Sequence, residues 1–148
     1  MRTNIPTLAA PGFFMAFVIA GLTGCAHAAS TSAPPAPPAR MEHIGHSQSL
    51  SVVLTPLGAR RIGIETVQAV ASGPLIVIPY GALLYEPDGQ SAVYVQVSAL
   101  VYTRRFVTVS TVTGDRVMLT GGVQPGTEVV TQGGEELLGV QNGVGVET

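Results

Sequence analysis

The chain has 148 residues, of which 46% are hydrophobic and 11% are charged, and it contains 18 glycines, 11 prolines and no tryptophan. This length suggests one domain, and the composition is typical of a small, turn-rich β protein behind an exported leader. The formal net charge is −2 and all 7 basic residues are arginines, so the chain lacks the electrostatic footprint of a nucleic-acid-binding protein.

Residues 1–24 have the features of a bacterial lipoprotein signal peptide. A short basic start precedes an apolar stretch over 8–22, which is too short and too poorly flanked for a membrane span. The stretch ends in the letters LTGC, which resemble a lipobox, so we expect Cys25, the sole cysteine, to carry a lipid. Ordinary secretion with cleavage after Ala28 is the alternative. The expected location is the periplasm, with the lipid anchored in a membrane. Ala26 after the cysteine favours the outer membrane, by analogy with lipoprotein sorting.

Residues 25–48 are predicted to form a disordered tether. The segment is rich in Ala, Ser, Thr and Pro and cannot bury enough apolar area to offset its ordering entropy. Its stretch 41–46 contains one thioether, from Met41, and two imidazoles, from His43 and His46, which are ligand types suited to copper or silver. An alternative function is therefore a periplasmic copper- or silver-binding lipoprotein, although histidines in a linker are more often solvated bystanders.

Residues 49–140 are predicted to be the folded domain and 141–148 a flexible tail. A strand is expected over 50–54, followed by a short helix with Thr55 as N-cap and Gly63 at its end. The next predicted strand covers 64–70.

Short runs of Val, Ile, Leu and Tyr, cut by Gly, Pro and Asp clusters, predict further β-strands joined by tight turns. In the strand over 92–97, alternation places the valines on one face and Tyr94 and Gln96 on the other. The predicted fold class is therefore all-β, a small antiparallel β-barrel or β-roll with one short helix. The strands are expected over 75–78, 80–85, 92–97, 101–112, 116–120 and 127–131, with turns at 86–89 and 113–115.

The letters VIPYGALLYEPDG, VYVQV and YTRRFVTVSTVTGDRVMLTGGVQPGTEVVTQGGEELL occur in this order from Val77 to Leu138. The series resembles the carboxy-terminal, membrane-proximal region of the periplasmic adaptor subunits, or membrane fusion proteins, of tripartite resistance-nodulation-division (RND) efflux pumps. The segment SLSVVLTPLGARRIGIETVQAV, from Ser49, resembles the amino-terminal portion of the same adaptors. Heavy-metal members of the family are thought to carry methionine-based sites near their amino terminus, which adds interest to Met41.

The resemblance also implies a large deletion. In a full-length adaptor, a lipoyl domain, usually an α-helical hairpin, and a β-barrel domain separate the two portions, whereas here only Ser72-Gly73-Pro74 joins them. We expect the two portions to close into one membrane-proximal-like module. The resemblance implies a partner, namely an inner-membrane RND transporter, including a heavy-metal one, or a full-length adaptor. A decayed adaptor that folds and binds nothing is a further reading.

The predicted docking residues are Arg104, Arg105 and Phe106, because Arg and aromatic residues concentrate binding energy at interfaces. The candidate anchors beside them are the tyrosines Tyr80, Tyr85, Tyr94 and Tyr102. A purely structural role, with half-buried tyrosines and arginines in cross-strand ion pairs, is the alternative.

An enzyme is not expected, and neither is a cofactor beyond the copper or silver ion. All three histidines lie in the tether, Cys25 is used in processing, and no carboxylate pair has the setting that acid–base chemistry needs.

Overall fold

The structure, a computed structural model, describes residues 36–44 and 49–144, all within one folded unit. Its amino-terminal elements are β1 (Ala39–His43), β2 (Leu50–Leu54), α1 (Pro56–Ile62), β3 (Glu65–Gln68) and β4 (Val70–Ser72). The remaining elements are β5 (Leu75–Pro79), the 3₁₀ turn η1 (Tyr80–Ala82), β6 (Leu84–Tyr85), β7 (Ser91–Ser98), β8 (Val101–Thr113), β9 (Arg116–Gly121), β10 (Glu128–Gln132) and α2 (Gly134–Gln141).

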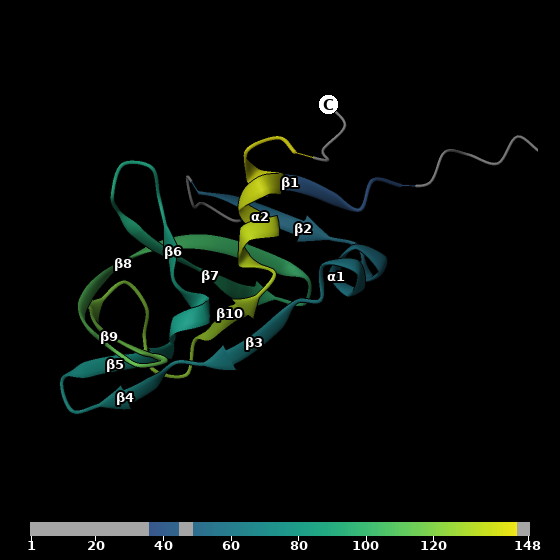
Figure 1. Ribbon diagram of the computed structural model, residues 1–148. Helices are drawn as coiled ribbons and strands as arrows, with labels where there is room; N and C mark the ends of the chain where they lie inside the picture. The colour runs from purple at the N-terminus through teal and green to yellow at the C-terminus, as the bar shows by residue number, and fades with distance from the viewer. Residues whose placement is uncertain (1–35, 45–48, 145–148) are drawn as a thin grey trace, which may run out of the picture. The chain divides into compact units, whose positions relative to one another are not determined.

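Seven strands form a nearly closed antiparallel barrel in the order β3–β10–β7–β8–β9–β5–β4. Only Ala69 separates β3 from β4, so the end of this path leads back to its beginning (Figure 1). The backbone stays paired where the chain changes partners, because Ala69 N donates to Thr127 O at 2.8 Å and Gly126 N donates to Ala69 O at 2.7 Å.

The barrel interior is filled mainly by small and branched aliphatic side chains. Alternation directs Val93 and Val95 of β7 inward, where they are 0% and 2% exposed. The other members of this core are Ala69, Ile78, Ala82, Leu83, Val107, Val117, Leu119, Val123 and Val129. Of these core residues, Ala69 alone precedes the turn at Gly73, and the others follow it.

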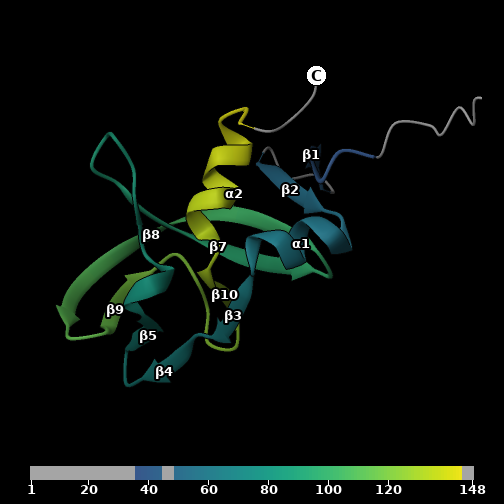
Figure 2. The ribbon, with the colours of Figure 1, turned by 45° about the vertical axis from the view of Figure 1, so that its right-hand side comes forward.

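A second layer covers one outer face of the barrel. Figure 2 shows α2, in yellow, standing over the β7–β8 side of the sheet, with the β1–β2 hairpin and α1 beside it. Tyr94, on the outer face of β7, is buried there together with Leu84, Val130 and Leu137. Both faces of β7 are therefore buried up to its far end, and the predicted split between its valines and Tyr94 is confirmed.

The predicted helix after β2 is confirmed with its two end signals. Thr55 Oγ1 accepts a hydrogen bond from Gly58 N at 3.0 Å, and Pro56 is the first helical residue. Gly63 ends the helix with φ 72°, a conformation that favours glycine.

The carboxy-terminal part of the predicted tether is a strand. Residues 39–43 form β1 and pair antiparallel with β2, from Ala39 opposite Leu54 to His43 opposite Leu50. The tether prediction was wrong for this stretch because it weighed composition alone. Ala39 is buried and Met41 is packed against the second layer, so an apolar alternation within ARMEH supplied a strand signal. Residues 25–35 and 45–48 of the predicted tether, like residues 1–24, lie outside the described residues.

The fold class is confirmed, and the structure adds a second helix that the sequence did not predict. Gly133 precedes α2 with φ 88°, and glycines also occupy its first position and its middle. Such glycines weaken helix propensity, so the local signal is poor. Leu137, which is fully buried, holds α2 on the barrel by tertiary packing.

The predicted strand over 80–85 is interrupted. Pro79 ends β5, Tyr80–Ala82 form η1, and the strand resumes only at Leu84 as the two-residue β6. The Glu86–Gly89 turn that follows forms as predicted, with Gly89 N donating to Glu86 O at 2.9 Å.

The two adaptor-like portions close into one module as expected. β2 pairs with β8, β3 with β10, and β4 with β5 across the short turn at Gly73. Among the described residues, no helix is long and apolar enough to cross a membrane.

Candidate functional site

The site begins with a gap in the pairing of β8. One edge of this strand pairs with β7 throughout residues 101–107. Its other edge pairs with β2 only as far as Thr103, and β9 takes over only at Thr108. Residues 104–107 therefore present an edge that neither β2 nor β9 covers.

Arg104 is held within the fold. Its Nη1 donates to Glu86 Oε1 at 2.9 Å, and the two side chains are 24% and 11% exposed. The guanidinium carbon also lies 5.4 Å from the centre of the Phe106 ring, within cation–π range. Glu86 belongs to the turn between β6 and β7, so this ion pair joins that turn to β8.

Arg105 and Phe106 are both exposed, and Phe106 keeps 50% of its surface accessible. Successive residues of a strand point to opposite faces, yet both side chains line one hollow of about 500 Å³ because it lies at the open edge of β8. Val97 and Gly122 line the same hollow. We call Val97, Arg105, Phe106 and Gly122 the β7–β8 surface.

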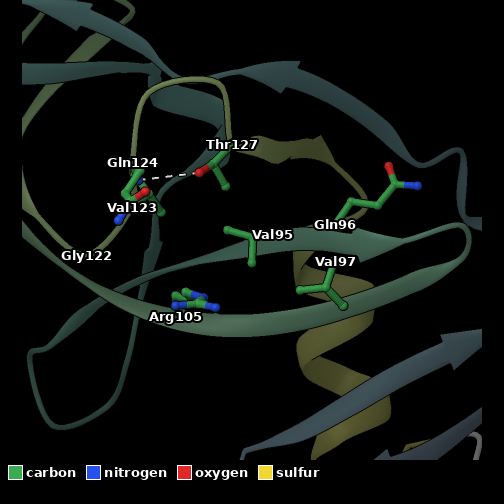
Figure 3. Close-up of a pocket in the computed structure, with 8 residues that line it drawn as sticks. All are labelled: Val95, Gln96, Val97, Arg105, Gly122, Val123, Gln124 and Thr127. Carbon is green, nitrogen blue, oxygen red and sulfur yellow. Dashed lines mark hydrogen bonds between the residues drawn. The ribbon is translucent and has the colours of Figure 1, made fainter. Parts of the chain in front are cut away.

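A second hollow, of about 540 Å³, shares three of these residues, namely Val97, Arg105 and Gly122. Figure 3 shows its lining, in which Gln96 extends away from Val95 and Arg105. The far wall is the loop after β9, braced by a hydrogen bond of 3.3 Å from Gln124 N to Thr127 Oγ1. Arg105 thus lies where the two hollows meet.

Gly122 brings this loop close to β8. It adopts φ 109°, and a Cβ atom there would lie 2.4 Å from Phe106 O and 2.7 Å from Val107 Cα. Only glycine fits this approach. Sequence reasoning missed Gly122, Val97 and Gln124 as parts of the site. The Gly121-Gly122 pair was a signal for a tight backbone approach, but nothing local indicated which strand it approaches.

Tyr80 and Tyr85 form a separate exposed cluster, 45% and 59% accessible. A hydrogen bond with Tyr80 raises the pKa of Tyr85. Tyr85 lies opposite Ser91, which in turn lies opposite Val107. Phe106 lies opposite Ala92, which in turn lies opposite Leu84. Side chains in adjacent rows of this kind point to opposite faces of the sheet. Tyr85 and Phe106 therefore lie on opposite faces of the sheet, and the predicted docking residues do not form one patch.

The other two candidate anchors, Tyr94 and Tyr102, are buried, so neither is offered to a partner. Tyr94 and Tyr102 are 1% and 3% exposed, and burial raises the pKa of both hydroxyls. Tyr94 OH donates a hydrogen bond to Gln141 Oε1, which joins the barrel to the last turn of α2.

The predicted copper or silver site stays a prediction. Met41 is packed against the second layer, His43 is exposed on β1, and His46 lies outside the described residues. Within 36–44 and 49–144, no group of three or more His, Cys, Asp or Glu side chains is arranged to hold a metal ion.

The fold defines a class, a small antiparallel β-barrel domain with two short helices on its outer side. Residues 75–136 match the family model described as RND MFPs, C-terminal permuted SH3 domain, so the chain contains a domain derived from an RND membrane fusion protein. The comparisons with curated proteins and with solved structures give no match.

The matched range runs from β5 into the first turn of α2, and β3 and β4 complete its barrel from outside the match. Membrane fusion proteins of this family are non-catalytic periplasmic adaptors of efflux pumps that associate with RND transporter components. The domain is therefore an efflux-related adaptor module.

Proposed function

We propose that this chain is a lipid-anchored periplasmic protein whose adaptor-derived barrel docks on an RND transporter, or on the transporter's full-length adaptor. The family match over residues 75–136 carries the proposal. The preceding segment supplies β3 and β4, which extend the strands of that match into a nearly closed barrel, and the β1–β2 hairpin beside it. A self-contained module of this family has a docking surface to offer without the longer parts of an adaptor.

The β7–β8 surface is the docking region in this proposal. It combines an exposed arginine, a half-exposed phenylalanine and two adjoining hollows, and protein interfaces concentrate their binding energy in such anchors and pockets. Tyr80 and Tyr85 make a second, smaller contact region, in which Tyr85 lies on the face of the sheet opposite to Phe106. A heavy-metal transporter is among the candidate partners.

The membrane anchor in this proposal is a lipid on Cys25. Mass spectrometry of the processed amino terminus tests it directly. A diacylglycerol-modified cysteine as the first residue is expected, and a chain that starts at Ala29 without lipid would contradict the anchor. A Cys25→Ser variant is expected to leave the membrane fraction.

An affinity capture tests the docking itself. The chain carries a carboxy-terminal tag, is expressed at native level, and is recovered after mild crosslinking from detergent-solubilised envelopes. We expect mass spectrometry to find an RND transporter or its adaptor, enriched over an equally abundant tagged lipoprotein. Recovery of bulk lipoproteins alone would count against docking and favour metal binding or a decayed adaptor.

A further inference from the structure

Arg105 combines an unpaired guanidinium with a position on the wall of two hollows. Arg60 and Arg61 of α1 also form no ion pair among the described residues, but neither lines these two hollows. Arg104 is neutralised by Glu86, and Arg40 by Glu42. Arg116 lines a hollow of about 390 Å³ that also contains Asp115. Arg105 has no carboxylate within ion-pair distance among the described residues, and neither of its two hollows is lined by an acidic side chain.

The side chains around Arg105 suit a carboxylate. The hollow of about 540 Å³ adds the amide of Gln124 and the hydroxyl of Thr127 at its wall, and Val95 and Val97 give it an apolar floor. A guanidinium offers a planar fork of donors that matches the two oxygens of a carboxylate. Apolar walls reduce the screening of such a pair by water, which strengthens it relative to a fully exposed ion pair.

We propose that Arg105 is the specificity-determining contact of the β7–β8 surface and that it receives an Asp or Glu side chain of the protein partner. Phe106 and Val97 supply the apolar contact beside the ion pair. This inference rests on the proposed function for the identity of the partner, but the recognition of a carboxylate is a property of this chain alone.

A protein carboxylate fits the surroundings of Arg105 better than an anionic lipid headgroup does. Binding to a lipid surface usually draws on several basic side chains together with a favourable net charge. Here the formal net charge is −2, and the neighbouring Arg104 is already paired with Glu86. A single unpaired cation within a concave surface is suited to one protruding acidic side chain.

The test is an NMR titration of the ¹⁵N-labelled chain with two blocked peptides, tetraglutamate and tetraglutamine. We expect saturable shifts of the Arg105 Nε–Hε signal and of the Gly122 and Gln124 amides with tetraglutamate, and none with tetraglutamine. Arg105→Gln should weaken tetraglutamate binding by about tenfold or more, whereas Arg60→Gln, an exposed arginine of α1, should leave it unchanged. Equal shifts at all exposed arginines, or no shift at Arg105, would overturn the inference.

Vesicles of phosphatidylglycerol decide between the two anion sources. Vesicle binding that depends on Arg105, combined with no response to tetraglutamate, would overturn the protein carboxylate in favour of a lipid headgroup. Failure of the wild-type chain to capture any transporter component would overturn the proposed function, whereas loss of discrimination between the two peptides would overturn this inference alone.

Discussion

Arg104 on β8 and Glu86 in the β6–β7 turn form an ion pair, with 2.9 Å between Nη1 and Oε1. The adjacent Arg105 has no such partner among the described residues. The two adjacent arginines thus have different roles. Arg104 stabilises the fold, and Arg105 is available to a partner.

This difference predicts effects of different size on stability for the same substitution at the two positions. Arg104→Gln leaves the mostly buried Glu86 carboxylate unpaired and should lower the free energy of unfolding by about 1–3 kcal/mol, a range already reduced for the partial exposure of the pair. Arg105→Gln should change it by less than about 0.5 kcal/mol. Urea unfolding followed by circular dichroism measures both. A double-mutant cycle with Glu86→Gln isolates the pair, and a zero coupling energy would contradict its role.

A second prediction concerns alkaline pH. Burial holds the pKa of Tyr94 above its ordinary value of 10.0, so the unfolded chain loses this proton before the folded chain does. The contribution of Tyr94 to the free energy of unfolding is complete below pH 10. As pH rises beyond 10 this contribution is lost, by up to about 1.4 kcal/mol per pH unit for each such tyrosine.

Tyr94→Phe should therefore flatten the alkaline loss of stability. At neutral pH the variant should be less stable by about 0.5–1.5 kcal/mol, because it lacks the hydrogen bond to Gln141. Urea unfolding across pH 8–11 (roughly the window in which tyrosine titrates) gives both quantities. The variant should keep part of the decrease in the free energy of unfolding with pH, because burial raises the pKa of Tyr102 as well. Identical slopes in the wild type and the variant would contradict the account.

A third prediction compares two glycines of one loop. Gly122→Ala introduces a Cβ 2.4 Å from Phe106 O, whereas Gly126→Ala meets nothing within 4 Å, although both glycines have positive φ. Gly126→Ala should cost about 1–2 kcal/mol from backbone strain alone, and Gly122→Ala about 1–3 kcal/mol more from the clash. Thermal unfolding of the two variants side by side gives the difference. Equal losses would mean that the loop does not approach β8 as closely as described.

A fourth prediction tests how α2 is held. Leu137→Ala removes a fully buried side chain from the second layer and should cost about 2–5 kcal/mol. Leu57→Ala on α1, where the side chain is 50% exposed, should cost less than about 1 kcal/mol. Urea midpoints of the two variants are the measurement. A small effect of Leu137→Ala would show that α2 contributes little to the domain.

Local signals in the sequence were sufficient to predict helix α1, the turns and most of the strands. Thr55, Pro56 and Gly63 determine α1 through capping and backbone preference, and the turn at Glu86–Gly89 follows from its own residues. The alternation in β7 predicted which residues share a face. Such features depend on neighbours within a few positions, so a single sequence contains them.

The features that were missed depend on partners distant in the sequence. The strand β1 forms because β2 lies beside it, and α2 is held by Leu137 on the barrel in spite of its glycines. The site was only partly predictable for the same reason. Arg104 and Arg105 were recognised as candidates, but the pairing of Arg104 depends on Glu86, which the fold brings to it. The hollow beside Arg105 likewise depends on the loop at Gly122.

Site-specific photocrosslinking in cells tests the central claim, that the β7–β8 surface docks on an RND transporter or its adaptor. A benzoylphenylalanine replaces Phe106 in one variant and Leu57 in the other, since the two side chains are equally exposed at 50%. We expect light-dependent adducts with the transporter or the adaptor from position 106 and none from position 57. The absence of such an adduct from position 106, or equal adducts from both positions, would contradict the account.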